Sequence, residues 1–135
     1  MPHKWEFHHD QIGYNFRMTN INAALLVAQL EQLDLLIDSK NKLASQYMNF
    51  FANKDYSFLS EINEAQSNHW LNTLIFNNLE QRNLFLKATN SAGIMTIFVW
   101  TLMSNLPMFK DCQKGSLTNS EWLEERAVNI PSSVI

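Results

Sequence analysis

Apolar residues recur every three or four positions between Leu26 and Phe51, which is the spacing of one face of an α-helix. The positions that share this face are Leu26, Leu30, Leu33, Ile37, Ala44, Tyr47 and Phe51. Asn20 precedes the pattern and can cap the first turn, because its side-chain oxygen can accept from a free backbone amide. Asp38 and Ser39 compete for backbone hydrogen bonds, so we expect a bend there. The sequence therefore predicts one long helix, or two nearly collinear helices, after about residue 20.

Residues 70–76 and 94–100 are the clearest strand candidates. The first run is rich in aromatic and branched side chains. The second is nearly all apolar, as expected of a strand that is covered on both faces. A helix is expected between them over residues 79–91, and a short additional strand near 56–59. The strand-helix-strand unit could form a parallel crossover or a split pair in an α+β layer.

Capping boxes mark the starts of the shorter helices, because a short polar residue and a glutamate three positions later satisfy free amides of the first turn. The two such pairs are Asn77 with Glu80 and Thr118 with Glu121. Gly93 is expected to close the helix over 79–91, since glycine adopts the left-handed conformation without a Cβ penalty. The second pair predicts a short helix through about residue 126, and Pro131 ends the regular structure. The expected fold class is α+β: a long N-terminal helix, a small strand-helix-strand layer and a short C-terminal helix.

The composition fits one globular domain in a reducing compartment. The chain has 135 residues, of which 46% are hydrophobic and 17% charged, and its formal net charge is -3. An acidic balance supplies no positive field for a polyanion, so nucleic acid is not expected as a partner. No apolar run reaches the ~18 residues that a bilayer span needs, so no membrane partner is expected either. Cys112 is the single cysteine, which excludes a disulfide within the chain and favours a cytoplasmic location.

Composition alone nominates no catalytic residue and no metal site. The candidate metal ligands that cluster are His3, His8, His9 and Asp10, but their spacing matches no established zinc pattern. These histidines are therefore expected to be surface or packing residues. Cys112 lies in a polar turn without a neighbouring base, and three glycines cannot build a phosphate-binding loop.

One segment carries a long and specific motif. Residues 13–25 read GYNFRMTNINAAL, and residues 28–34 read AQLEQLD. This resembles the G-Y-N-[YF]-R-M-x-[ND]-[IL]-x-A-A-L…A-Q-L-E-x-L segment of the DegT/DnrJ/StrS family of pyridoxal-phosphate-dependent nucleotide-sugar aminotransferases. Further segments follow in the family's order over essentially the whole chain: 67–73, 93–96, 100–103, 106–109 and 129–133. The resemblance is nearest to the subgroup that aminates a nucleotide-linked keto-sugar on the way to legionaminic-type nonulosonic acids, and glutamate is the family's usual amino donor.

The resemblance implies the C-terminal portion of an enzyme with the fold-type I, aspartate-aminotransferase-like architecture. Residues 1–20 would be an irregular segment that carries the motif, and residues 21–135 would be the small domain, incomplete at both ends. In the family, the lysine that forms a Schiff base with pyridoxal phosphate lies in a large domain that precedes this region. The chain is therefore expected to be inactive and to bind no cofactor alone. Its expected partner is a second copy in a homodimer or the missing large domain, and the intact enzyme would also bind a nucleotide-sugar substrate.

None of the chain's lysines sits in a motif that matches the catalytic lysine of the family. They are Lys4, Lys40, Lys42, Lys54, Lys87, Lys110 and Lys114. A lysine on a helix or in a turn is usually solvated, and all of these are expected to have that role. The resemblance therefore assigns no catalytic residue to this chain.

The resemblance gives site positions to Asn15 and Trp100, and the charge of Arg17 makes it a further candidate. Asn15 corresponds to the asparagine that reaches across the dimer interface to the cofactor phosphate of the other subunit, where an amide can donate without adding charge. Arg17 could add a charge-assisted contact to a cofactor or nucleotide phosphate. Trp100 corresponds to a position near the sugar-binding mouth, where a flat aromatic face can pack on substrate. The structural alternatives are a turn for Asn15, an ion pair for Arg17 and a core position for Trp100.

One departure from the family pattern bears on substrate binding. Ile97 and Phe98 stand where close relatives tend to have Arg-Pro, and loss of a cation there would weaken the contact with an anionic substrate. Two alternatives to an aminotransferase fragment stay open. The chain could be a non-catalytic α+β module that binds another protein through its apolar helix face, or a remnant of an interrupted gene.

Overall fold

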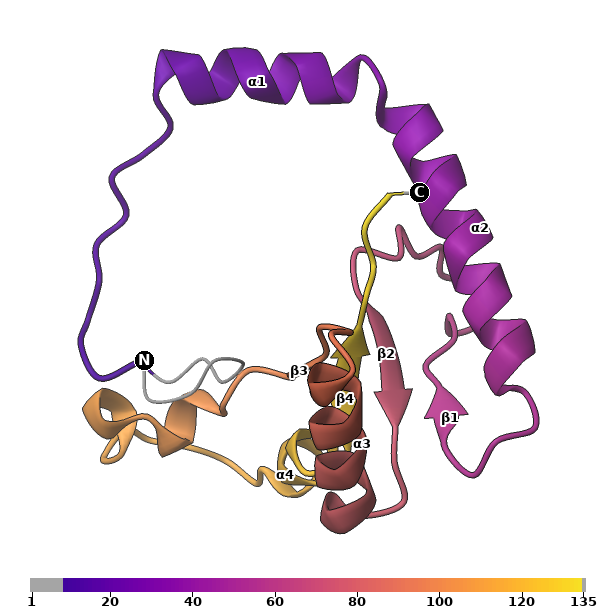
Figure 1. Ribbon diagram of the computed structural model, residues 1–135. Coiled ribbons are helices and arrows are strands. Elements are labelled where there is room, and N and C mark those ends of the chain that lie inside the picture. The colour runs from indigo at the N-terminus through magenta and orange to yellow at the C-terminus, as the bar shows by residue number, and fades with distance from the viewer. Residues whose placement is uncertain (1–8, 135) are drawn as a thin grey trace.

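Four antiparallel strands form the sheet within residues 9–134, which the computed structural model describes (Figure 1). They are β1 (Ser57–Phe58), β2 (Asn72–Ile75), β3 (Ile97–Phe98) and β4 (Ala127–Ile130), in the spatial order β1-β2-β4-β3. Because β2 and β3 both pair antiparallel with β4, they run in the same direction with one strand between them. The strand-helix-strand unit is therefore the split pair and not the parallel crossover.

The strand β4 corrects the expected order of elements, in which no strand follows the short C-terminal helix. Its four residues pair with β2 on one side and β3 on the other, and all four are buried. One of these buried residues, Asn129, is polar. Its side-chain oxygen accepts a hydrogen bond from the Thr73 hydroxyl at 2.8 Å. The run Ala-Val-Asn-Ile is thus short and interrupted, and it lacks the periodicity by which a central strand is usually found.

The long N-terminal helix is in fact two helices. α1 (Asn20–Leu30) and α2 (Leu33–Phe51) are separated at residues 31–32. Their axes point in clearly different directions in Figure 1, so they are not collinear. Residues 38–39 lie inside α2 without interrupting it, and the bend expected there is wrong.

The N-caps of α1 and α3 lie one residue away from the expected positions. The Thr19 hydroxyl, rather than the Asn20 side chain, accepts from a backbone amide in the first turn of α1 at 3.3 Å. In α3 (Leu79–Ser91), the side-chain oxygen of Asn78, rather than that of Asn77, accepts from a backbone amide at 2.9 Å. In both helices, the residue with extended backbone immediately before the first turn is the one that caps it.

The C-terminal end of α3 is closed by Gly93, as expected. Gly93 has a φ of +79°, and its amide donates to the carbonyl of Asn90 at 3.1 Å. The amide of Ile94 donates to the carbonyl of Thr89 at 2.9 Å, which completes a Schellman motif. In contrast, α4 (Thr118–Glu124) begins with the threonine that was expected to cap it, and no side chain caps this helix.

The core lies on one face of the sheet, where side chains of α2 and α3 meet the strands. Its buried members are Phe51, Leu74, Phe76, Leu86, Val128 and Ile130. Leu74 and Val128 stand opposite each other in the register of β2 and β4, and Phe51 and Leu86 come from the two helices. Burial of these side chains is the main force that holds the helices on the sheet.

The strand β3 is shorter and more exposed than its apolar sequence predicts. Only Ile97 and Phe98 pair with β4, at the edge of the sheet, and both side chains are half-buried. The expected cover on both faces is therefore wrong. Thr96 is buried instead, with its hydroxyl oxygen 2.6 Å from that of Thr89 on α3.

Residues 9–19 form an irregular arm that extends away from the sheet and leads into α1 (Figure 1). α1 is mostly apolar, yet none of its residues is buried. We call this region the uncovered α1 surface, and its large apolar members are Ile21, Leu25, Leu26, Val27 and Leu30. A helix that is apolar all round is normally covered. Neither α1 nor another helix within residues 9–134 is long and apolar enough to cross a membrane.

Candidate functional site

The arm presents Asn15 and Arg17 in a tight turn. The side-chain oxygen of Asn15 accepts from the backbone amide of Arg17 at 2.8 Å, and Arg17 has a φ of +70°. Both residues are exposed. The turn uses the oxygen end of the Asn15 amide and leaves its NH₂ group as a donor. The turn expected as the alternative role of Asn15 is therefore present, and it is compatible with a role in binding phosphate.

Arg17 differs from its structural alternative. Within residues 9–134 its guanidinium makes no ion pair with a carboxylate. The arm and the sheet lie apart in Figure 1, so a single chain does not bring Arg17 and Asn15 into one site with the strands.

The structural alternative for Trp100 was a position in the core, and this alternative is wrong. Half of its surface is exposed, and its ring stacks on that of Trp70, with ring centroids 6.1 Å apart and an interplanar angle of 27°. Trp70 is 65% exposed. Trp70 was predicted only as the start of a strand, so no link with a site was expected for it.

A network of polar contacts fixes the backbone that carries Trp70. The side-chain oxygen of Asn68 accepts from the Trp70 amide, and the Ser67 hydroxyl accepts from the His69 amide, each at 3.0 Å. His69 is buried and has a φ of +46°, a conformation that side chains other than glycine rarely adopt. Its imidazole lies 3.2 Å from the carboxylate of Glu61, which also accepts from the Ser67 amide.

Lys40 on α2 contradicts the expectation that every lysine is solvated. It is half-buried, and its ammonium nitrogen donates to the carbonyl oxygens of His69, Trp70 and Ser132 at 3.4, 3.3 and 2.6 Å. The other lysines within residues 9–134 are exposed, as expected: Lys42, Lys54, Lys87, Lys110 and Lys114. Lys4 lies outside the described residues. Lys40 thus has a structural role in joining α2 to the start of β2 and to the segment after β4.

The described residues offer donors for the phosphate group of pyridoxal phosphate, but they offer no suitably placed amine for its aldehyde group. The phosphate requires donors, and the arm supplies the Asn15 amide and the Arg17 guanidinium. A Schiff base requires a lysine amine in an enclosed site. Among residues 9–134, Lys40 is committed to three carbonyl oxygens and the remaining lysines stand in the open. No catalytic step through the cofactor can therefore be assigned to these residues.

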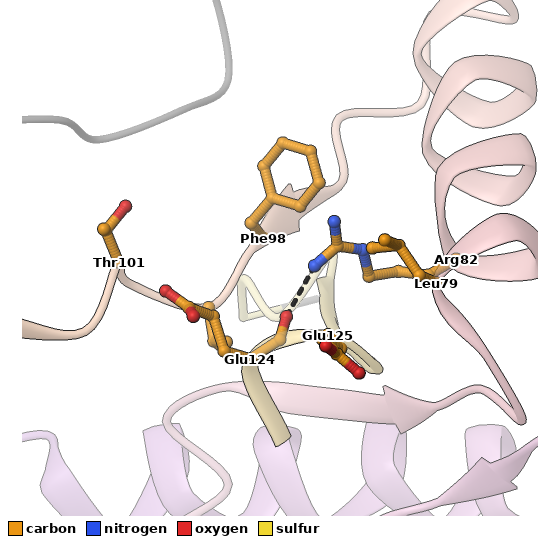
Figure 2. A pocket seen from close by; sticks show the side chains of 7 residues that line it. Leu79, Arg82, Phe98, Thr101, Glu124 and Glu125 are labelled. Atoms are coloured by element: carbon orange, nitrogen blue, oxygen red, sulfur yellow. Dashed lines mark hydrogen bonds between the residues drawn. The ribbon is translucent and has the colours of Figure 1, made fainter. Parts of the chain in front are cut away.

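A pocket of about 250 Å³ lies between β3, α3 and α4 (Figure 2). The guanidinium of Arg82 lies over the Phe98 ring, 4.5 Å from its centroid, and donates to the backbone carbonyl of Glu124. The Glu124 carboxylate accepts in turn from the amide of Leu102 at 2.8 Å. A cation therefore stands beside Phe98, although it comes from α3 rather than from the strand. Because its donors tie α3 to α4, we regard this pocket as structural.

Within the described part of the chain, the candidate metal ligands are not brought together into a site. Residues 9–134 contain no group of three or more His, Cys, Asp or Glu side chains that could hold a metal ion. His9 and Asp10 are exposed, whereas His3 and His8 lie outside the described residues. Cys112 is exposed.

Two curated relatives of the chain are GDP-perosamine synthases. GDP-perosamine synthase of Escherichia coli O157:H7 is 31% identical over 132 residues, which cover 94% of this chain and 34% of that protein. GDP-perosamine synthase of Vibrio cholerae is 29% identical over 127 residues, which cover 92% of this chain and 35% of that protein. The chain thus spans about a third of the length of the curated relatives it matches.

Solved structures share the fold. Helicobacter pylori PseC, an aminotransferase involved in the biosynthesis of pseudoaminic acid, superposes with a TM-score of 0.77 at 20% identity, over 92% of this chain and 34% of that one. DesV of S. venezuelae superposes with a TM-score of 0.77 at 20% identity, over 97% of this chain and 36% of that one. The family model described as the DegT/DnrJ/EryC1/StrS aminotransferase family matches residues 2–134. Since the match covers nearly the whole sequence, the chain belongs to the DegT/DnrJ/EryC1/StrS aminotransferase family.

Proposed function

We propose that the chain is the C-terminal part of a pyridoxal-phosphate-dependent aminotransferase that moves an amino group from an amino acid, expected to be glutamate, to a nucleotide-linked keto-sugar. The product would enter surface-polysaccharide or nonulosonic-acid biosynthesis in the cytoplasm. The match of residues 2–134 to the aminotransferase family carries the proposal. The names of the relatives, GDP-perosamine synthase above all, support a nucleotide-sugar substrate. When bound, pyridoxal phosphate supplies the aldehyde that takes up the amino group and a ring that withdraws electrons.

In this proposal the sheet, α2 and α3 are the centre of a small domain over residues 21–135, and the preceding segment, residues 1–20, contains the arm. The arm reaches a second subunit, where the Asn15 amide donates to the phosphate of that subunit's cofactor and Arg17 adds a charged contact. Two features support this role. The turn orients the Asn15 side chain through its oxygen, and neither residue is buried against its own chain.

The chain on its own is proposed not to transaminate. The reason is chemical: Lys40 is held by three carbonyl oxygens, and the other described lysines have no enclosed site in which to hold a cofactor. A lysine supplied by a large domain would complete the site. The purified chain is accordingly expected to add no visible absorbance band to that of free pyridoxal phosphate. A band that disappears on adding an amino donor, with amino-sugar formed, contradicts this part of the proposal.

A chimera tests the role of the arm. The matching third of E. coli GDP-perosamine synthase is replaced by this chain, and cofactor affinity and amino transfer are measured. The chimera is expected to bind pyridoxal phosphate. Asn15→Ala is expected to weaken cofactor binding about tenfold, because one hydrogen bond to a charged group is lost.

Asn22→Ala is the matched control, since Asn22 is an exposed asparagine of α1 close to the arm. This variant is expected to bind the cofactor as the unaltered chimera does. Equal cofactor affinity in Asn15→Ala and Asn22→Ala rules out the proposed contact. A folded chimera without cofactor binding or amino transfer counts against the aminotransferase function itself.

A second candidate function is favoured by one observation, the uncovered α1 surface. Its five large apolar side chains are between 48% and 75% exposed, and a patch of this kind promotes association with another protein. A non-catalytic interaction module would use this surface without any cofactor. The two functions differ in a simple measurement, because only the aminotransferase requires Asn15 for binding pyridoxal phosphate in the chimera.

A further inference from the structure

Trp70 and Trp100 form a stacked pair on the surface of the protein, which we call the tryptophan platform. Their ring centroids lie 6.1 Å apart at an interplanar angle of 27°, and the two residues are 65% and 50% exposed. Large aromatic side chains stabilise a protein mainly when they are buried. Two indoles that stack on each other and still face solvent offer flat aromatic faces to a ligand.

The backbone beneath the platform is held firmly. Trp70 follows His69, which is buried and has a left-handed backbone conformation. The Nε2 atom of His69 lies 3.2 Å from a carboxylate oxygen of Glu61. Lys40 donates to the carbonyl oxygens of both His69 and Trp70. Backbone strain of this kind persists where the surroundings fix it, and it is concentrated at binding and catalytic sites. The exposed position of Trp70 is thus imposed by buried and half-buried neighbours.

The chemistry around the platform favours stacking over polar recognition. The Asn68 side-chain oxygen accepts from the Trp70 amide, the Ser67 hydroxyl accepts from the His69 amide, and the Lys40 ammonium is taken up by carbonyl oxygens. These contacts hold the loop in place through the oxygens of Ser67 and Asn68 and the Lys40 ammonium, and they leave the Asn68 NH₂ group as a donor. A hexose needs partners for several hydroxyl groups, whereas a nucleobase can be held through its flat face alone. A purine has a face similar in size to an indole.

We propose that the tryptophan platform stacks on the purine base of a nucleoside diphosphate, and that Trp70 is a binding residue alongside Trp100. This inference deepens the proposed function and rests on it for the choice of a nucleotide-linked substrate. It concerns the end of the substrate that is distant from the reacting sugar carbon. Trp70 and Trp100 therefore hold the substrate by its base and take no part in the chemical step.

Guanosine diphosphate titrated into the 135-residue chain tests the platform without any cofactor, with the indole N–H resonances followed by two-dimensional NMR. The resonances of Trp70 and Trp100 are expected to shift with saturation. Trp70→Ala is expected to raise the dissociation constant about tenfold, and Trp70→Phe, which keeps an aromatic face, to raise it at most about threefold.

Trp122 provides the matched control. It is 48% exposed on α4 and has the Arg126 guanidinium 5.0 Å from its ring centroid. Its resonance is expected not to shift, and Trp122→Ala is expected to bind the nucleotide as the unaltered chain does. A hexose without a base is the second probe, and it is expected to leave both platform resonances unchanged.

The proposal is overturned if guanosine diphosphate leaves the platform resonances in place, if the hexose alone shifts them, or if Trp70→Ala and Trp122→Ala bind equally well. A Trp70→Ala variant that does not fold is replaced by Trp70→Phe and Trp70→Leu, which must differ in affinity if stacking matters. If the nucleotide does not bind while the chimera is active, only the proposal of the tryptophan platform is contradicted. If the platform resonances shift while the chimera is inactive, only the proposed amino-transfer function is contradicted.

Discussion

The ammonium nitrogen of Lys40 lies 2.6 Å from the carbonyl oxygen of Ser132, which follows it in the chain by 92 residues. The same nitrogen donates to the carbonyls of His69 and Trp70, so one side chain of α2 ties together the loop before β2 and the segment after β4. Three carbonyl oxygens around one cation form charge-assisted hydrogen bonds, which are stronger than neutral ones. Lys40 is thus the clearest link between the helical half of the chain and its sheet.

Removing this cation is expected to destabilise the protein. Lys40→Met keeps most of the length of the side chain and loses its hydrogen bonds, and we expect the free energy of unfolding to fall by about 1–2 kcal/mol. Urea denaturation measures the change. Lys42→Met, two positions along the same helix and exposed, is the control and is expected to change stability by less than about 0.5 kcal/mol. Similar losses in both variants contradict the structural role of Lys40.

Gly93 offers a test of backbone conformation without side-chain packing. Its φ is +79°, and a Cβ added there meets no atom within 4 Å. Gly93→Ala is therefore expected to destabilise the protein by about 1 kcal/mol through the left-handed backbone alone. Gly115 also has open space around its Cβ position but no left-handed φ, so Gly115→Ala is expected to be neutral or slightly stabilising. Thermal unfolding measures the melting temperatures of both variants. Equal melting temperatures for Gly93→Ala and Gly115→Ala contradict the Schellman closure of α3.

The uncovered α1 surface is expected to cause self-association of the chain. Leu26 and Leu30 are 48% and 56% exposed on this surface. Replacing each with Asp is expected to weaken association about tenfold, because an apolar side chain is lost from the contact. Light scattering across a range of concentrations measures the effect.

Leu84→Asp supplies the control for this prediction. Leu84 is 61% exposed on α3, away from the uncovered α1 surface. This variant is expected to associate as the unaltered chain does. A chain that stays monomeric at every concentration tested shows that α1 does not need a partner.

Much of the fold could be predicted from local signals. The bounds of α3 are those of the sequence pattern, because a polar cap precedes the helix and Gly93 follows it. The helical periodicity predicted α2, and the split strand pair was one of the two open arrangements. The motif around Asn15 indicated the family, although its site roles stay predictions.

The features that could not be predicted depend on contacts between distant residues. β4 is a strand because β2 and β3 lie on either side of it, and its own four residues carry too little pattern to show it. Trp70 and Trp100 belong to different elements, and their stacking requires the folded chain. Lys40 has the sequence context of an exposed helical lysine, yet the carbonyl groups it binds lie 29 to 92 residues away.

Tyr47 is expected to make the stability of the protein sensitive to alkaline pH. Burial raises the pKa of its phenol above the ordinary value of 10.0, and its hydroxyl donates to the carbonyl of Pro131 at 3.0 Å. In the unfolded chain this phenol loses its proton near pH 10, whereas the folded chain keeps it to higher pH. Stability from this group is therefore complete below pH 10 and is lost as the pH rises through the pKa of the folded state. Tyr47→Phe is expected to lower the free energy of unfolding by about 1 kcal/mol at pH 7 and to flatten its decline above pH 10.

Tyr56→Phe is the control for the alkaline effect, because the Tyr56 ring packs against the same core, 5.6 Å from Phe51. Urea denaturation between pH 8 and pH 11 compares the two variants with the unaltered chain. The decline of stability with pH is expected to persist in Tyr56→Phe and to become shallower in Tyr47→Phe. If both variants retain the full decline, other groups cause the alkaline loss of stability, and the raised pKa of the Tyr47 phenol does not contribute to it.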